Sequence, residues 1–162
     1  LVGSEMCIRD RCVPPQMFND QIISSTLIRK LLKEGNILLA NRLLGTNFML
    51  EGTVIRGAQL GRTIGFPTAN IKYTPEIVQI PFGVYSARVN NRPAVLNWGM
   101  KPTVHNTKEP IVEVHIINFD GDLYGKNIEI EITSKIRDEK KFRGLEELRT
   151  QIEKDVKECL KL

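Results

Sequence analysis

Long hydrophobic runs are missing from this sequence of 162 residues. No stretch of 18 apolar residues occurs, so no segment is predicted to span a membrane. Cysteine is scarce: Cys7 and Cys12 lie close together near the first residue, and Cys159 stands alone. This distribution gives neither a disulfide framework nor a zinc-binding pattern. It suits a protein of the reducing cytoplasm.

Aromatic residues, histidine and excess charge are also sparse. Aromatic residues make up 6% of the chain, and 23 basic against 19 acidic residues leave a net charge of +4. A nucleic-acid-binding barrel would need a basic face interleaved with exposed aromatic rings, so we expect no nucleic-acid partner. The two histidines, His105 and His115, have no third ligand at a recognisable spacing, which argues against zinc.

The remaining composition, 41% hydrophobic and 26% charged, is ordinary for a globular domain. Helices are predicted from about Leu27 to Gly35 and from about 37 to 44, and the character then changes to short apolar runs separated by turns. The predicted strands are 49–56, 83–90, 93–98, 111–119 and 127–133. A final helix is predicted over about 145–160, with an apolar stripe that should pack on the sheet: Leu145, Leu148, Ile152, Val156 and Leu160. Closely spaced strands without long intervening helices favour an antiparallel barrel.

A glycine-rich segment precedes the tetrapeptide Pro-Thr-Ala-Asn at 67–70. Gly57, Gly61 and Gly65 recur every four residues, which matches neither a Walker A loop nor a dinucleotide-binding fingerprint. Glycine lets backbone N–H groups approach phosphate oxygens, and the side-chain oxygens of Thr68 and Asn70 are of the kind that Mg²⁺ accepts beside nucleotide phosphates. An ordinary hairpin turn is the alternative interpretation.

Several motifs in one order resemble the riboflavin kinase family. They are Phe-Pro-Thr-Ala-Asn at 66–70, Pro-Phe-Gly-Val-Tyr at 81–85, Asn-Trp-Gly-Met-Lys-Pro-Thr-Val at 97–104, Val-Glu-Val-His at 112–115, Asp-Leu-Tyr-Gly at 122–125 and Arg-Asp-Glu-Lys-Lys-Phe at 137–142. The resemblance implies a mainly β fold, a six-stranded antiparallel Greek-key barrel with a C-terminal helix, preceded here by a short helical remnant.

The segment before the barrel resembles a second module. Ser-Ser-Thr-Leu-Ile-Arg at 24–29 is similar to a motif near the end of the adenylyltransferase module of bacterial FAD synthetases, and 43–45 match the junction that follows. We therefore expect a non-native tail at 1–12, an adenylyltransferase remnant at 13–45 and a riboflavin kinase domain at 46–162. A genuine divergent tail is the alternative for 1–12. The FAD-forming activity of the parent protein is expected to be absent from this chain.

Glu113 matches the family's catalytic glutamate. The alternation of the run 111–117 places Val112, Val114 and Ile116 on one face and Glu113 with His115 on the other. The pattern alone would make Glu113 a solvated outer-face residue, whereas the resemblance implies a general base toward the terminal ribityl hydroxyl. His115 is expected to orient Glu113.

The resemblance also implies the remaining binding residues. Thr68 and Asn70 would hold Mg²⁺, although both could instead hydrogen-bond local backbone. Gly57, Gly61 and Gly65, with Pro67 of the motif, would cradle the phosphates. Each of the other candidates has an alternative: Arg62 could add charge or be solvated, Tyr124 could flank the nucleotide or pack on the barrel, and Arg137 and Phe142 could lie near the flavin or serve as a surface cation and a helix anchor. Trp98 stands where the family usually has a smaller aliphatic residue.

The implied activity is ATP-dependent phosphorylation of riboflavin to FMN, with Mg²⁺ as the metal and riboflavin, FMN, ATP and ADP as ligands. The alternative function is a flavin-binding barrel without catalysis. Retention of Thr68, Asn70 and Glu113 argues against that alternative, since binding riboflavin requires neither metal ligands nor a base. The oligomeric state does not follow from the sequence.

Overall fold

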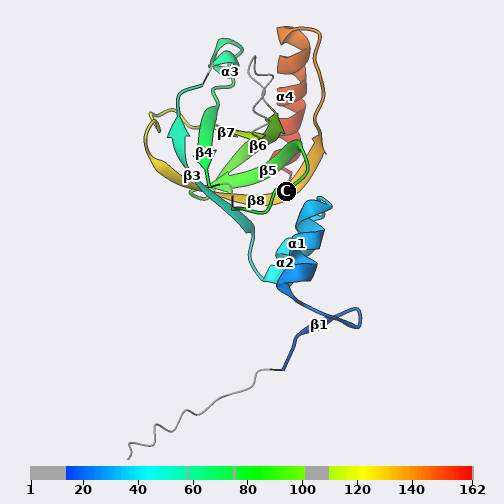
Figure 1. The fold of residues 1–162 in the computed structure, drawn as a ribbon. Helices are drawn as coiled ribbons and strands as arrows, with labels where there is room; N and C mark the ends of the chain where they lie inside the picture. Colours follow the sequence, from blue (N-terminus) through cyan, green and yellow to red (C-terminus); the bar gives the residue numbers. More distant parts are fainter. Residues whose placement is uncertain (1–13, 58, 75, 101–109, 162) are drawn as a thin grey trace, which may run out of the picture.

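The computed structural model describes residues 14–57, 59–74, 76–100 and 110–161. The predicted tail at 1–12, the part of the 97–104 motif that follows Met100, and His105 lie outside these residues. Within them, six antiparallel strands close into a barrel in the order β3-β4-β7-β6-β5-β8 (Figure 1). The strands are β3 (Phe48–Ile55), β4 (Ala69–Tyr73), β5 (Gly83–Val89), β6 (Arg92–Met100), β7 (Pro110–Ile116) and β8 (Asn127–Asp138). Because β8 returns to lie beside β5, the first strand of the β5-β6-β7 meander, the topology is a Greek key, and the predicted fold is confirmed.

The barrel core follows the predicted alternation. On β7, Val112 and Val114 are fully buried, whereas Glu113 lies on the outer face and is only partly buried. Trp98 is also fully buried, and its ring lies 5.3 Å from that of Tyr73. The interior thus accommodates the large side chain at this position.

β4 was missing from the strands predicted by pattern. Its five residues follow Pro67 and contain Asn70, both of which are typical of turns. The ladder with β7 nevertheless pairs Ala69 with Val114 and Asn70 with Glu113. The tetrapeptide motif therefore runs from a loop into a barrel strand.

β8 extends five residues beyond its predicted end at 133. Its pairing with β5 shifts register twice, so that Thr133 and Ile136 have no direct partner on β5. Such bulges break the period-2 pattern on which the prediction relied. Thr133 fills one irregularity by donating its hydroxyl hydrogen to the Ser86 carbonyl oxygen (2.9 Å).

The final helix, α4 (Leu145–Cys159), packs on the outside of the barrel (Figure 1). A second apolar cluster joins Cys159 and Val156 of α4 to outer-face residues of the strands, including Val84 and Val95. The predicted stripe is wrong at its ends, because Leu145 and Leu160 are exposed at 46% and 56%.

The start of α4 lacks a side-chain cap at Gly144. Glu147 compensates by accepting the Arg143 backbone N–H (3.1 Å), in the manner of a capping box. This hydrogen bond, and a second from Lys140, hold the pKa of the Glu147 carboxyl below its usual value. The turn before α4 is thereby fixed from within the helix.

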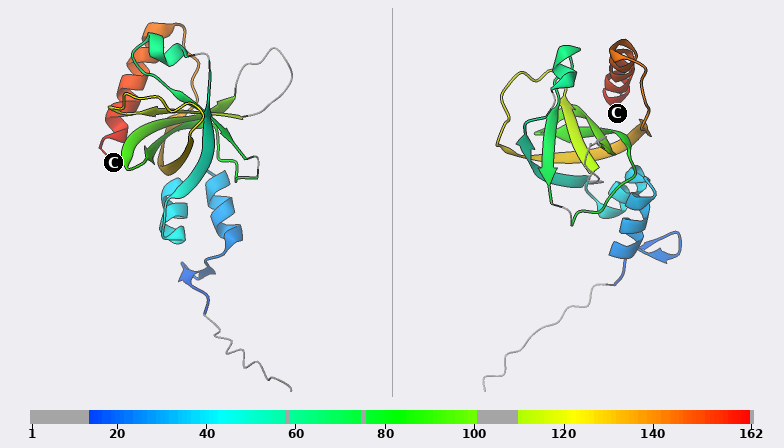
Figure 2. Two further views of the ribbon diagram at one scale, coloured as in Figure 1. Left: turned by 90° about the vertical axis from the view of Figure 1, so that its left-hand side faces the viewer. Right: turned by 45° about the horizontal axis from the view of Figure 1, so that its top comes forward.

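Two predicted helices, α1 (Ser25–Lys33) and α2 (Ile37–Leu44), pack against one end of the barrel (Figure 2). Ser24 caps α1 and Gly45, at φ 74°, ends α2. A small hairpin, β1 (Met17–Phe18) and β2 (Gln21–Ile22), precedes them. None of the described helices is long and apolar enough to cross a membrane.

Candidate active site

The glycine-rich loop lies at the barrel end opposite α1 and α2, where the chain leaves β3, forms the short helix α3 (Leu60–Thr63) and enters β4 (Figure 2). A Cβ on Gly57 would overlap the side-chain amide of Asn70, and a Cβ on Gly61 would overlap the carbonyl oxygen of Phe66. Gly65 has open space around it but a φ of 87°, which L side chains rarely adopt. The glycines thus shape the loop for three different reasons.

Thr68 lies between two cavities at this end of the barrel, and it lines both of them. The larger, of about 440 Å³, is here named the large cavity. Its lining residues are Val54, Arg56, Gln59, Arg62, Pro67, Thr68, Ala69, Val114, Ile116, Phe119, Asp120, Gly121, Asp122, Leu123 and Tyr124.

The smaller, of about 190 Å³, is here named the small cavity. It opens between the outer face of the strands and α4. Its lining residues are Leu60, Gly61, Ile64, Phe66, Thr68, Val84, Val95, Asn97, Glu113, His115, Arg137, Glu139, Lys140, Phe142, Leu148, Ile152 and Asp155. Most of the sequence-predicted residues line one of these two adjoining cavities, and Thr68 lines both. The predicted residues Gly57, Gly65 and Asn70 line neither cavity.

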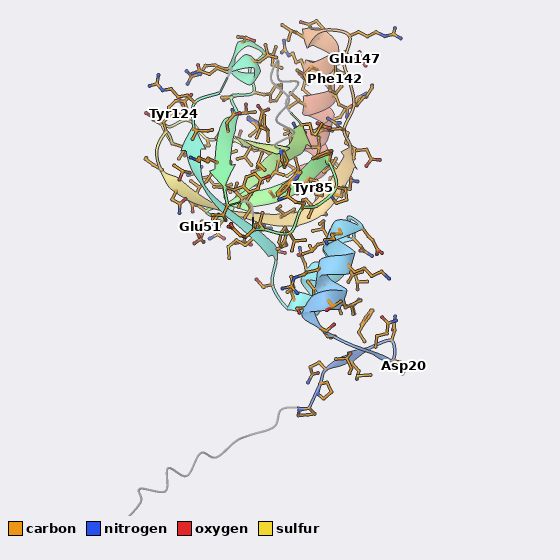
Figure 3. All side chains as sticks on the ribbon, in the orientation of Figure 1. Asp20, Glu51, Tyr85, Tyr124, Phe142 and Glu147 are labelled. Carbon is orange, nitrogen blue, oxygen red and sulfur yellow. The ribbon has the colours of Figure 1, made fainter. Side chains whose placement is uncertain are left out.

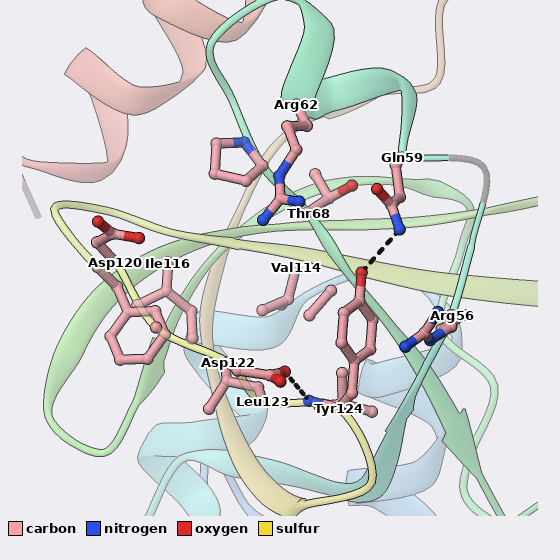
Figure 4. Close-up of a pocket in the computed structure, with 15 residues that line it drawn as sticks. Arg56, Gln59, Arg62, Thr68, Val114, Ile116, Asp120, Asp122, Leu123 and Tyr124 are labelled. Carbon is pink, nitrogen blue, oxygen red and sulfur yellow. Dashed lines mark hydrogen bonds between the residues drawn. The ribbon is translucent and has the colours of Figure 1, made fainter.

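The large cavity is lined by charged groups of both signs: two arginines, Arg56 and Arg62, and two aspartates, Asp120 and Asp122 (Figure 4). The Tyr124 hydroxyl accepts a hydrogen bond from Gln59 Nε2 (3.1 Å), and the Arg56 guanidinium carbon lies 5.2 Å from the Tyr124 ring centroid. Figure 4 shows Arg62 reaching from α3 toward Thr68. Within the described part of the chain, neither Arg56 nor Arg62 forms an ion pair, so both cations can meet an anionic ligand.

A row of three polar residues adjoins the small cavity, and two of them, Asn97 and Glu113, line it. The ladders pair Glu113 of β7 with Asn70 of β4 on one side and with Asn97 of β6 on the other. Paired residues of adjacent strands point to the same face of a sheet, so three polar side chains share the outer face here. Asn70 is 8% exposed and lies against Gly57, which lacks the side chain that would displace it.

Apolar side chains from α3, the strands and α4 form most of the remaining wall of the small cavity. They include Leu60, Ile64, Phe66, Leu148 and Ile152. Phe142 also lines this cavity, with the guanidinium carbon of Arg137 at 5.7 Å and Lys140 Nζ at 5.5 Å from its ring centroid. Figure 3 shows Phe142 beside the start of α4 and Tyr124 on the other side of α3. An apolar slot with a polar edge suits a flat, partly hydrophobic ligand.

Arg137 has a partner that the sequence did not indicate. Its Nε and Nη2 atoms donate to the Asp155 carboxylate at 2.8–3.1 Å, and Nη1 donates to the Asp138 carbonyl oxygen (2.9 Å). Asp155 is only 2% exposed and also accepts from Gln151 Nε2 (2.9 Å). Arg137 is thus neither a surface cation nor a free one: it ties β8 to α4 beside the cavity.

His115 bonds to the loop that carries Thr68. Its Nδ1 lies 2.8 Å from the Pro67 carbonyl oxygen, and its ring meets Phe66 edge-on with centroids 5.4 Å apart. The expectation that His115 orients Glu113 is not tested by these contacts. They show instead that the His115 ring contacts the loop before β4, at Phe66 and Pro67.

Sequence reasoning missed Arg56, Gln59 and Asp155. Arg56 directly precedes Gly57, and Gln59 lies between Gly57 and Gly61, so both could have been included by proximity. Asp155 lies on α4, 18 residues after Arg137, in a helix whose pattern places acidic residues on the solvent side. Nothing in the sequence marks Asp155 as buried.

The donor set near Thr68 fits a nucleotide-bound divalent cation. Among the described residues, no cluster of three or more His, Cys, Asp or Glu side chains could hold a metal by itself. Thr68 and Asn70 offer neutral oxygens, which suit Mg²⁺ only where phosphates supply the negative charge. Such a metal would arrive with its nucleotide.

Comparison with known proteins agrees with this arrangement. The family model described as riboflavin kinase matches residues 44–162. The bifunctional riboflavin kinase/FMN adenylyltransferase of Bacillus subtilis is 43% identical over 148 residues, covering 88% of this chain and 47% of its own length. The protein of the same name from Escherichia coli K12 is 41% identical, covering 82% of this chain and 44% of its own length. The chain thus spans about half the length of the curated relatives it matches.

Among solved structures, a chain from Streptococcus pneumoniae described as a macrolide-efflux protein matches with a TM-score of 0.80 and 33% identity, over 90% of this chain and 49% of that one. This similarity bears on the fold, and the activity in that description belongs to that protein. The family match covers most of the chain and includes all the residues that line the two cavities. By sequence and by fold, the chain belongs to the riboflavin kinase family.

Proposed function

We propose that this protein transfers the γ-phosphoryl group of ATP to the terminal ribityl hydroxyl of riboflavin, giving FMN and ADP. The observation that carries the proposal is the shared position of Thr68, which lines the cavity of Arg56 and Arg62 on one side and the cavity of Glu113 on the other. A kinase needs its two substrates to meet at such a boundary, because phosphoryl transfer depends mainly on positioning and charge neutralisation.

The large cavity would bind the nucleotide. Arg56 and Arg62 are cations without described carboxylate partners, and they would meet the phosphates or the base. Tyr124 offers an aromatic face, and the backbone at Gly57, Gly61 and Gly65 would approach the phosphates closely. Thr68 and Asn70 would hold Mg²⁺, whose charge offsets that of the phosphates when the metal is bound.

The small cavity would bind riboflavin. The isoalloxazine ring would lie among Leu60, Ile64, Phe142 and Ile152, with its ribityl chain directed to the polar edge at Glu113. The Glu113 carboxylate accepts the proton of the terminal hydroxyl group while the oxygen of that hydroxyl forms a bond to the γ-phosphorus. The bond from that phosphorus to the bridging oxygen breaks, and ADP leaves.

The names of the relatives include a second activity, FMN adenylyltransferase. They are bifunctional, and the riboflavin kinase model begins at residue 44 of this chain. We assign residues 13–45 to the end of an adenylyltransferase part and 46–162 to the kinase domain. Cys159 is a buried free thiol, which is in keeping with a cytoplasmic enzyme.

The test is a chromatographic assay of the purified protein with riboflavin, ATP and Mg²⁺. FMN formation that requires all three supports the proposal. Tight riboflavin binding without FMN would instead favour a flavin-binding module without catalysis. FAD in the same chromatogram would add adenylyl transfer to the activities of this chain.

A further inference from the structure

The strand ladder between β4 and β7 ends where the phosphate-binding segment begins. Its last pair joins Ala69 to Val114. Two residues earlier, Pro67 has no backbone N–H and cannot continue the ladder as a donor. Thr68 therefore lies just beyond the end of the sheet, where the backbone would be free to move.

At this point a side-chain hydrogen bond, made by His115, replaces the backbone pairing of the two strands. His115 Nδ1 lies 2.8 Å from the Pro67 carbonyl oxygen, joining residues 48 apart in sequence. A carbonyl oxygen can only accept, so Nδ1 carries the hydrogen. The bond persists when the ring is protonated, because Nδ1 is a donor in both charge states.

Thr68 is consequently held from both sides. The Ala69 pair fixes the backbone that follows it, and the His115 hydrogen bond fixes the carbonyl that precedes it. The Thr68 methyl group also packs toward Gly61, since Cγ2 lies 3.4 Å from the place of a Cβ on that glycine. These contacts leave the Thr68 side chain little freedom.

His115 and Glu113 alternate along β7 and share its outer face. The same strand therefore carries the proposed base and the group that holds the loop. We infer that His115 is a positioning residue: its hydrogen bond to Pro67 sets the distance between Thr68, at the boundary of the two cavities, and Glu113. The kinetic consequence rests on the proposed kinase function, but the loop geometry does not.

A matched pair of variants tests this inference. In His115→Asn, the side-chain amide nitrogen stands close to the place of Nδ1 and can donate to Pro67. In His115→Leu, a side chain of similar shape has no donor. One exposed hydrogen bond contributes modestly to stability, so both variants should fold. If His115→Leu does not fold, His115→Ala replaces it.

The first measurement uses the full chain without ligands. Amide hydrogen exchange of Phe66 and Thr68 should become about 5-fold faster in His115→Leu, and His115→Asn should restore most of the protection. Equal exchange in the wild type and both variants would overturn the inference. This result does not depend on whether the protein is a kinase.

The second measurement is steady-state kinetics. His115→Leu should lower kcat about 10–100-fold, the usual effect of losing a group that orients a reacting one, and His115→Asn should recover most of the rate. Equal rates in the two variants would overturn the positioning role. An inactive wild type would instead refute the proposed function, and the exchange data would still decide on the loop.

Discussion

At the scale of single residues, the proposed chemistry centres on Glu113, between Asn70 and Asn97 in the polar row. Sequence pattern alone placed Glu113 on an outer face, which is correct, and could not tell a solvated carboxylate from a base. That distinction depends on α4 and α3, which turn this part of the outer face into a cavity wall. Alternation along one strand contains no information about what covers it.

Replacing Glu113 by Gln tests the proposed base. The amide has nearly the same shape but cannot accept the hydroxyl proton, so kcat should fall about 10²–10⁴-fold while calorimetry still detects MgATP binding. Glu129→Gln, at an exposed position on β8, is the matched control and should leave kcat unchanged. Near-normal turnover in Glu113→Gln would remove this residue from the role.

Gly57→Ala tests the proposed metal ligand without altering it. The added Cβ would overlap the Asn70 amide and displace it, so the Mg²⁺ and ATP concentrations for half-maximal rate should rise together by about 10–100-fold. Gly144→Ala is the control: no atom lies within 4 Å of its Cβ position and its φ is −177°. Unchanged Mg²⁺ dependence in both Gly57→Ala and Asn70→Ala would exclude Asn70 as a ligand.

At the scale of elements, helices were predicted more accurately than strands. Ser24, Gly35 and Gly45 mark helix ends by local capping, and α1, α2 and α4 lie close to their predicted ranges. β4 was not predicted because its first residues belong to the Pro-Thr-Ala-Asn tetrapeptide, whose proline and asparagine are typical of turns. The end of β8 was predicted too early because of its bulges, which depend on pairing with β5 rather than on local sequence.

The ion pair between β8 and α4 yields a prediction at this scale. Arg137→Met leaves the Asp155 carboxylate, whose side chain is 3% exposed, without its bidentate partner. The free energy of unfolding in urea should fall by about 3–5 kcal/mol, because an uncompensated buried charge is costly. Arg149→Met is the control, since its pair with Glu153 is about half exposed on both sides (53% and 46%) and should contribute less than about 1 kcal/mol. Equal urea unfolding midpoints for Arg137→Met and Arg149→Met would mean that the ion pair between Arg137 and Asp155 does not anchor α4.

At the scale of the whole molecule, the proposed domain boundary near residue 45 is not a boundary in the core. Leu32 is 2% exposed and Ile37 is 1% exposed, and both belong to the same apolar cluster as the barrel interior. Asn41 of α2 adds hydrogen bonds across the junction: it donates to the Ile132 carbonyl oxygen (2.9 Å) and accepts from the Phe48 N–H (2.8 Å). The motif resemblance assigns α1 and α2 to a different module from the barrel, whereas side-chain packing joins these helices to the barrel.

If α1, α2 and the barrel unfold as one cooperative unit, a defect in α1 must weaken the barrel. Trp98 is the single tryptophan of the chain and is fully buried in the barrel, so its fluorescence reports barrel unfolding alone. Leu32→Ala should shift the urea midpoint of that signal by an amount equivalent to about 2–5 kcal/mol. The control is Leu38→Ala on α2, where the side chain is 64% exposed and the effect should stay within about 0.5 kcal/mol. An unchanged Trp98 midpoint in Leu32→Ala, with lost helical circular dichroism, would show that the helices unfold independently and that the division at residue 45 is also a folding boundary.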